Sequence, residues 1–286
     1  RAVHIVGVYR TARASQIRDR DRPCLRATML AMKNTQGLTI LLEDEQLLVV
    51  NKPAGLLTVP GRQGGHSLRE AVAYTLGITQ KLFLVHRLDA GTSGVLLLAK
   101  TPEAQRHLAQ QFQNRLVQKE YLAIVRGSPE EDSGLIVAPI APHPRIPAKM
   151  IVSEKKGRPS QTKWQIVDRF QGISLVRCRP LTGRQHQIRV HLALIEMPLL
   201  VDPLYGNAEA FYLSQLKVGY KPSNRHEERP LLARLSLHAD ALNFTHPRTN
   251  HPVRVEAPLP KDLHATLTQL RKLCGSAGGA ALPEPA

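Results

Sequence analysis

One short segment, "HRLDAGTSG" at residues 86–94, combines residue types that could do chemistry. Asp89 follows His86 and Arg87, and small residues, two of them glycines, come after it. A carboxylate in such a turn could be a nucleophile, a metal ligand, a salt-bridged structural acid or the acid of a hydrolase triad. The glycines permit a tight backbone path, and the turn offers hydroxyl and N–H groups to a neighbouring acid. The following "GVLLLAK" predicts a buried strand, so we expect Asp89 at the rim of a sheet.

A second segment, "TGRQHQIRVHLALIE" from residue 182, changes to helical spacing. Its apolar stripe consists of Ile188, Leu192 and Ile195. A Thr-Gly turn that opens a helix leaves unpaired backbone N–H groups, which suit phosphate. On such a helix Gln185, His186 and Arg189 would share a polar, basic face. The alternative is a solvated face, although Lys and Glu are the usual residues there.

A third segment, "QKEYLAIVRG" at residues 118–127, places Tyr121 at the head of a predicted strand. Tyr121 could stack on one base, but a tyrosine in this position is more often a core residue with its hydroxyl satisfied. Only 4% of the residues are aromatic, which excludes an extended stacking platform for single strands.

The elements that must position these residues are mostly strands. We expect a helix from Pro102 to about Asn114, capped by Thr101, and a final helix capped by Asp262. The predicted strands are two within 39–55, then 94–100, 120–127, 134–140, 161–167 and 173–181, and a hairpin over 234–247 and 251–258. Many strands with few helices between them predict an α+β fold with a largely antiparallel sheet.

Charge is the most informative property of the composition. The 286 residues carry a formal net charge of +16, of which the first 35 residues hold +6. The remaining excess indicates a polyanionic partner, most often nucleic acid. Cys24, Cys178 and Cys274 are far apart, which supports neither a disulfide framework nor a zinc knuckle and suits a reducing compartment. No apolar run approaches the roughly 20 residues of a membrane-spanning helix.

The two ends of the chain differ in composition from the rest. Residues 1–37 are rich in arginine and could be a basic RNA-binding arm, a targeting segment or sequence upstream of the true start. We expect this segment to be disordered and residues 275–286 to form a flexible tail.

Five motifs in order resemble the RluA-type pseudouridine synthases. "HRLDAGTSG" is similar to the signature His-Arg-Leu-Asp-x-x-Thr-Ser-Gly of that family. The other blocks are "VNKPAGLLTVPGR", "QKEYLAIVRG", "LTGRQHQIRVH" and "LSLHA". The similarity spans roughly residues 39–260 and is greatest to short members that lack the N-terminal S4 RNA-binding module. It implies a mixed, largely antiparallel bent sheet flanked by helices, in a catalytic domain at 38–274 with an insertion at 206–232.

The resemblance also implies roles for four residues. Asp89 matches the catalytic aspartate, and Tyr121 matches the tyrosine that stacks against the target uracil. Arg189 matches the basic residue that pairs with the aspartate. Arg87 matches an arginine that fills or contacts the place left by the flipped nucleotide. The implied enzyme isomerises uridines in ribosomal RNA, transfer RNA or both, and requires no cofactor and no metal. We expect a cytoplasmic monomer with no membrane association.

Two alternatives belong to other classes of function. A non-catalytic RNA-binding protein would keep the charge and the "TGRQHQIRVH" segment but would not need Asp89. A hydrolase built from Ser93, His86 and Asp89 is disfavoured, because the three residues crowd within eight positions and no G-x-S-x-G motif is present.

Overall fold

The computed structural model describes residues 38–59, 81–217, 219–220 and 227–275, together with 68, 71, 72, 74 and 77. The predictions for residues 1–37 and for the tail beyond residue 275 therefore lie outside the described residues.

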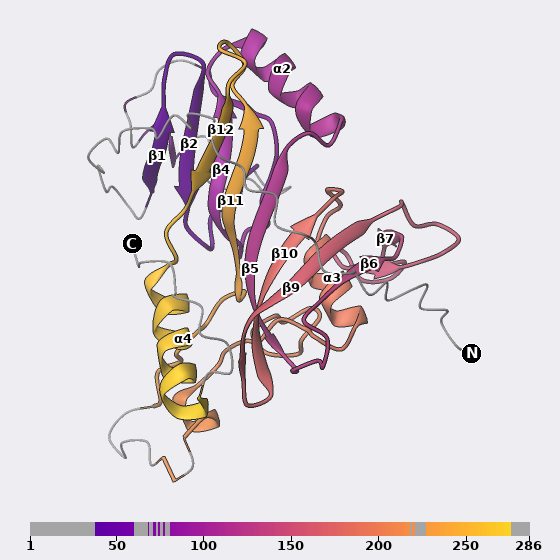
Figure 1. Cartoon of the computed structure of the whole chain (residues 1–286), viewed down its shortest axis with the longest axis vertical. Helices are drawn as coiled ribbons and strands as arrows, with labels where there is room; N and C mark the ends of the chain where they lie inside the picture. Colours follow the sequence, from indigo (N-terminus) through magenta and orange to yellow (C-terminus); the bar gives the residue numbers. More distant parts are fainter. Residues whose placement is uncertain are drawn as a thin grey trace, which may run out of the picture.

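A mixed β-sheet forms the centre of the fold (Figure 1). Its strands follow the order β1-β2-β4-β11-β5-β10-β9-β6, with β3 also pairing with β4 and β12 with β11. Every described strand pair is antiparallel except β4 with β11. The strands are β1 (Thr39–Glu43), β2 (Leu47–Lys52), β3 (Phe83–Leu84), β4 (Ser93–Ala99), β5 (Gln118–Arg126), β6 (Ser133–Val137), β9 (Gln161–Phe170), β10 (Ile173–Pro180), β11 (Leu237–Thr245) and β12 (Pro252–Glu256). A separate pair is β7 (Ile140–Pro142) and β8 (Met150–Val152).

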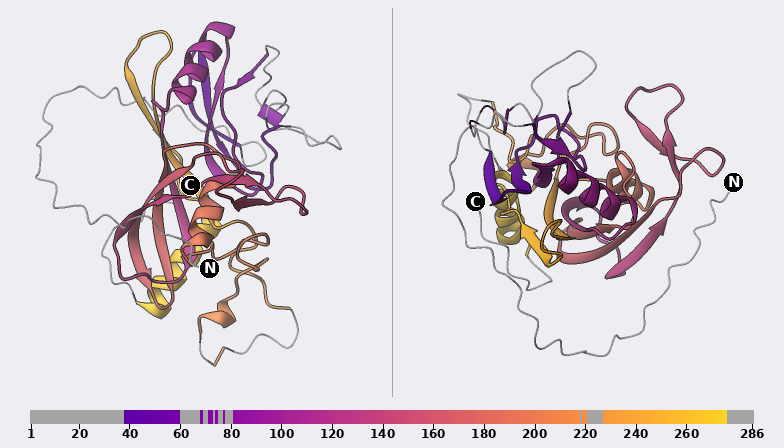
Figure 2. Two further views of the ribbon diagram at one scale, coloured as in Figure 1. Left: turned by 90° about the vertical axis from the view of Figure 1, so that its right-hand side faces the viewer. Right: turned by 90° about the horizontal axis from the view of Figure 1, so that it is seen from above.

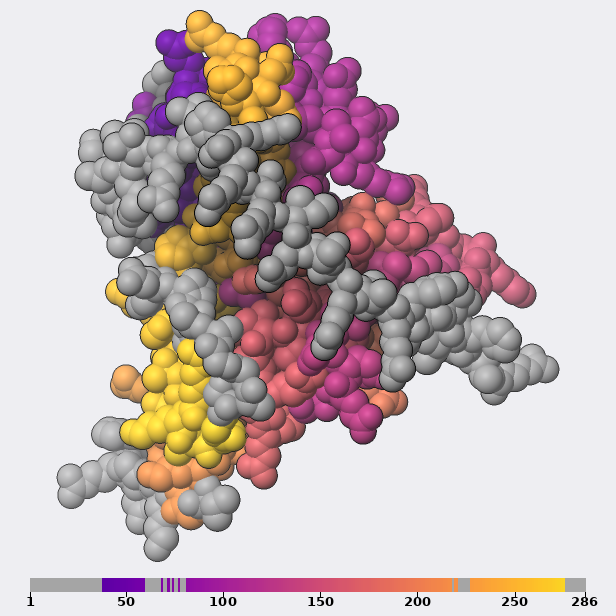
Figure 3. Space-filling view, viewed as in Figure 1, coloured from indigo at the N-terminus to yellow at the C-terminus, as the bar shows by residue number. Residues whose placement is uncertain are grey.

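Three α-helices of the described residues flank this sheet: α2 (Pro102–Gln113), α3 (Gln187–Leu194) and α4 (Lys261–Cys274). Helix α2 packs against β4 and α4 against β9, near opposite ends of the sheet (Figure 2). Viewed from above in Figure 2, the sheet curves with α2 on its inner side. In the space-filling view, α4 occupies the lower part of the face shown (Figure 3). These observations confirm the predicted α+β class with a mixed, largely antiparallel sheet.

The apolar runs of the sequence become buried strands, as predicted. All seven residues of β4 are buried, and so are five of the six residues of β2. The predicted cap of α2 is also present, because the Thr101 hydroxyl accepts a hydrogen bond from the N–H of Ala104 at 3.2 Å. No helix in the described part of the chain is long and apolar enough to cross a membrane.

Three predicted boundaries were wrong. The single strand expected at 134–140 divides into β6 and β7, because Pro139 between them has no N–H for a ladder hydrogen bond. Tyr121 is the fourth residue of β5 rather than its head. Helix α4 is capped by Pro260; Asp262 lies in its first turn, where both carboxylate oxygens accept hydrogen bonds from Arg234 at 2.7 Å.

Gly94 is required where β4 meets β11. Its φ is +115°, and an added Cβ would lie 2.1 Å from the carbonyl oxygen of Ala239 on the parallel neighbour β11. Neither that conformation nor that space accommodates a side chain. The turn that carries Asp89 therefore enters the sheet at a position that only glycine can occupy.

Gly94→Ala should destabilise the protein by about 3 kcal/mol or more, because a backbone clash adds to the strain of a positive φ. Gly172→Ala is the matched control: Gly172 also has a positive φ, of +69°, but nothing lies within 4 Å of the added Cβ. It should cost only about 1 kcal/mol. Urea denaturation measures both, and equal losses would contradict the proposed clash.

Candidate active site

The turn that carries Asp89 is fixed through the backbone of its two neighbours. On one side, the Thr58 hydroxyl donates to the carbonyl of Leu88 at 2.8 Å and accepts from its N–H at 3.3 Å. On the other side, the carbonyl of Ala90 accepts a hydrogen bond from the N–H of Gly55 at 2.8 Å. The segment 55–58 thus holds Asp89 from both flanks.

Lys52 adds a third attachment from inside the protein. Its side chain is fully buried, and its ammonium donates to the carbonyls of Pro53, Leu56 and Ala90 at 2.9, 2.7 and 3.0 Å. Burial lowers the pKa of Lys52 to about 8, although the charge of Asp89 opposes this shift. Sequence analysis missed this residue; the signal was a lysine that ends the apolar run "LLVVNK" just before a Pro-x-Gly turn.

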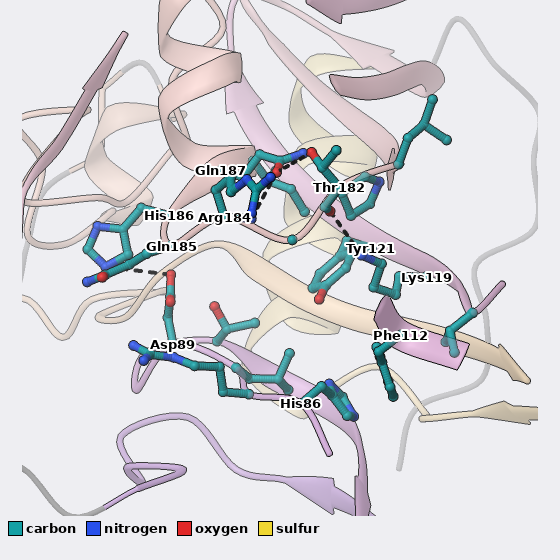
Figure 4. A pocket seen from close by; sticks show the side chains of 18 of the residues that line it. His86, Asp89, Phe112, Lys119, Tyr121, Thr182, Arg184, Gln185, His186 and Gln187 are labelled. Atoms are coloured by element: carbon teal, nitrogen blue, oxygen red, sulfur yellow. Dashed lines mark hydrogen bonds and ion pairs between the residues drawn. The ribbon is translucent and has the colours of Figure 1, made fainter. Parts of the chain in front are cut away.

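A cavity of about 600 Å³ opens beside this turn (Figure 4). Residues from four segments line it: 85–92, 112–121 and 180–189, together with Leu237 from β11. Asp89 is the only carboxylate among the described lining residues. The cationic side chains of the lining are Arg87, Arg115, Lys119, Arg184 and Arg189. The positive potential of such a cavity attracts a polyanion, and Asp89 would then lie against the bound polyanion.

Arg189 connects Asp89 to a second acid, Asp202. Its Nη1 lies 3.5 Å from Oδ2 of Asp89, whereas its Nε and Nη2 donate to the two carboxylate oxygens of Asp202 at 2.7 Å each. Burial opposes the charge on Arg189, but the hydrogen bonds and charge of Asp202, with the charge of Asp89, outweigh it and raise its pKa. The predicted contact of Arg189 with Asp89 is present, although the tighter partner is Asp202.

Tyr121 and Lys119 extend into the same cavity from alternate positions of β5 (Figure 4). Burial, with the charge of Asp89, raises the pKa of the Tyr121 hydroxyl, which therefore stays protonated at neutral pH. Burial, with the charge of Arg115, lowers the pKa of Lys119 to about 8. The Lys119 ammonium donates to the carbonyl of Thr182 at 2.9 Å and so fixes the opposite wall.

The segment 182–186 is a turn and not the first turn of a helix, contrary to the prediction. Helix α3 begins only at Gln187, and its N-cap His186 has a positive φ of +55°. The Gln187 side chain replaces the expected cap, because its Oε1 accepts from the Thr182 hydroxyl at 2.7 Å and from the N–H of Arg184 at 3.0 Å. Gln185 and His186 therefore do not share a helix face with Arg189.

This turn nevertheless brings His186 to the acid. Nε2 of His186 lies 3.8 Å from Oδ2 of Asp89, and the two side chains occupy the same end of the cavity (Figure 4). Burial lowers the pKa of His186, even though the charge of Asp89 opposes the shift. A neutral imidazole therefore faces the carboxylate at pH 7.

Arg87 is exposed and lines the cavity. With the other described residues its guanidinium makes no hydrogen bond or ion pair, so it is available to a ligand.

The hydrolase interpretation fails on geometry. Nε2 of His86 accepts the N–H of Leu97 at 3.0 Å, and its ring stacks on Phe112 at 4.8 Å. Burial, with the charge of Lys119, lowers the pKa of His86 to about 3. Ser93 instead contacts Nδ1 of the buried His238 at 2.9 Å. A metal site is equally unsupported within the described residues, where no three His, Cys, Asp or Glu side chains are grouped to hold an ion.

Comparison with known proteins matches residues 46–194 to the sequence model of a family described as RNA pseudouridylate synthase. The chain belongs to this family. It is 40% identical over 240 residues to ribosomal large subunit pseudouridine synthase D of Nitrosomonas europaea, an alignment that covers 82% of this chain and 66% of that protein. It is 39% identical to ribosomal large subunit pseudouridine synthase C of Escherichia coli, over 81% of this chain and 70% of that one.

A solved structure has a similar fold. Human RNA pseudouridylate synthase domain containing 4 superposes with a TM-score of 0.63 at 28% identity, over 81% of this chain and 92% of the human one. These findings confirm the resemblance to RluA-type pseudouridine synthases, which are RNA-modifying isomerases. None of them supports non-catalytic RNA binding.

Asp202→Asn should destabilise the protein by about 3–5 kcal/mol, because it leaves the buried Arg189 without its main counter-charge. Asp132→Asn is the matched control, since Asp132 is an exposed acid paired with Arg169 and should change stability by at most about 1 kcal/mol. Urea denaturation compares the two, and similar small losses would show that Arg189 does not depend on Asp202.

Proposed function

We propose that this chain converts uridine to pseudouridine in ribosomal RNA with Asp89 as the nucleophile. One observation carries the proposal: Asp89 is the only carboxylate among the described residues of a cationic cavity, and it faces an arginine whose charge is mainly balanced elsewhere. The two bacterial relatives named above are ribosomal large subunit enzymes, which favours ribosomal RNA over transfer RNA.

The reaction is a redox-neutral isomerisation. The bond between N1 of uracil and C1′ of ribose breaks, the base turns, and a bond between C5 and C1′ forms. The proton on C5 is released and N1 gains a proton, so the atoms balance without an added reactant. The ionised carboxylate of Asp89 attacks either the ribose or the base and leaves again when the new bond has formed.

The contacts of Asp89 suit a nucleophile. A strong charge-assisted hydrogen bond is about 2.7–2.9 Å long. The contacts of Asp89 with Arg189 and His186 are 3.5 and 3.8 Å, whereas Arg189 is held at 2.7 Å by Asp202. Asp89 is therefore directed by positive charge without being locked into a tight ion pair.

Tyr121 and Arg87 serve the flipped nucleotide in this proposal. A base inside a helix cannot reach a nucleophile, so the uridine must leave the stack at a cost of a few kcal/mol. The ring of Tyr121 in the cavity wall would pack against the uracil, and the exposed Arg87 would occupy the vacated position. Arg115 and Arg184 lie in the same lining and would bind the flanking phosphates.

We also assign residues 38–274 to one catalytic domain with an insertion at 206–232. In support, the backbones of Phe211 and Leu232 pair, which joins the first part of the insertion to its last residue. A cytoplasmic location completes the proposal, since three widely spaced cysteines suit a reducing compartment. We take a monomer as the default state.

Asp89→Asn should abolish turnover and leave RNA binding intact, because the amide keeps the shape of the side chain but is not a nucleophile. Release of tritium from RNA labelled at C5 of uridine measures turnover, and a filter-binding assay measures affinity. Fragments of large-subunit ribosomal RNA and a transfer RNA should be compared as substrates. Turnover by the variant at the wild-type rate would refute the role of Asp89.

Tyr121→Leu should lower turnover by about tenfold to hundredfold, because stacking on one base contributes about 1–3 kcal/mol. The apolar replacement keeps the residue compatible with its buried strand, so the melting temperature should change little. Unchanged turnover would mean that Tyr121 is only a core residue.

A further inference from the structure

Tyr205 lies directly behind the cavity wall, in the loop "VDPLYG" at 201–206. Its hydroxyl has two polar neighbours: it accepts the N–H of Met150, the first residue of β8, at 2.8 Å, and it lies 2.9 Å from Nδ1 of His186. The guanidinium of Arg189 lies 4.9 Å from the centre of its ring. Tyr205 is not among the described lining residues of the cavity, but it contacts two of them, His186 and Arg189.

The polar neighbours of the Tyr205 hydroxyl favour one of the two neutral tautomers of His186. The hydroxyl of Tyr205 accepts from Met150 and has one proton of its own to donate, and Nδ1 of His186 is within reach. The neutral ring then carries its proton on Nε2, which faces Asp89 at 3.8 Å. The other tautomer would direct the Nε2 lone pair at a carboxylate, which is electrostatically unfavourable.

The surroundings of His186 keep this ring neutral. The charged groups that act on it are Asp89 and Asp202, which favour protonation, and Arg189 and Arg87, which oppose it. Burial is the largest influence, and the net effect lowers the pKa of His186. In this form Nε2–H points its positive end at the carboxylate from 3.8 Å, without adding a second full charge beside Arg189.

We propose that Tyr205 is a positioning residue whose hydroxyl holds His186 as the neutral Nε2–H tautomer directed at Asp89. This inference rests on the proposed function of the site and assigns it one further residue. Asp202 supports the same arrangement, because its Oδ1 accepts the N–H groups of Leu204 and Tyr205 at 2.9 and 3.2 Å. One buried acid therefore orients both Arg189 and the loop that carries Tyr205.

Tyr205→Phe tests this proposal, because it removes the hydroxyl and keeps the ring that packs against Arg189. Nitrogen-15 NMR of histidine-labelled protein reports the tautomer of His186, with His186→Gln used to assign its signal. Wild-type protein should show protonated Nε2 and unprotonated Nδ1, and Tyr205→Phe should show a mixture. The single-turnover rate on ribosomal RNA should fall about tenfold, the effect of losing one hydrogen bond, while RNA affinity stays within about twofold.

Tyr220→Phe is the matched control, since Tyr220 is half-buried and lies outside the lining of the cavity. It should leave both the tautomer and the rate unchanged. A wild-type tautomer or a wild-type rate in Tyr205→Phe would overturn the proposal. An equal loss of affinity and rate, together with a lower melting temperature, would also overturn it, because that result indicates a structural role only. If wild-type protein forms no pseudouridine, the proposed function fails separately, and the tautomer measurement still tests the Tyr205 contact.

Discussion

The ion pair between Arg189 and Asp202 is the interaction on which the rest of the site depends. Both side chains are almost completely removed from solvent, so neither charge could persist there without the other. Because Asp202 uses two of the guanidinium donors, Arg189 has a fixed orientation and only one nitrogen left near Asp89. The site therefore contains a charged arginine that directs the acid but does not neutralise it.

The other ionisable side chains of the cavity lining include arginines that stay charged and histidines that stay neutral. The arginines of the lining cannot lose their protons and provide a constant positive potential for a phosphate backbone. The two histidines of the lining, His86 and His186, have lowered pKa values because burial disfavours the imidazolium. The neutral ring of His186 lies 3.8 Å from Asp89 and does not compete with Arg189 for its charge.

The sequence predicts what depends on local patterns. Apolar runs and turn residues locate the strands, and the composition around Asp89 predicts a tight turn at the rim of the sheet. The role of Asp89 itself comes from the family resemblance. The roles of Lys52, Asp202 and Tyr205 follow from contacts between distant segments, such as the one from Lys52 to Ala90, and no local spacing encodes them. The start of α3 was misplaced because the Gln187 side chain takes over the capping expected from a Thr-Gly turn.

The attachment of the Asp89 turn through main-chain atoms is consistent with the first of the two variable positions in His-Arg-Leu-Asp-x-x-Thr-Ser-Gly. Ala90 occupies the first and is held by its carbonyl oxygen, which every amino acid has. Gly91 occupies the second, where an added Cβ would lie 2.8 Å from Cγ of the buried Leu235, so a side chain there would force this core residue to shift. The main-chain attachment is thus independent of the side chain at position 90, whereas the packing of Leu235 favours glycine at position 91.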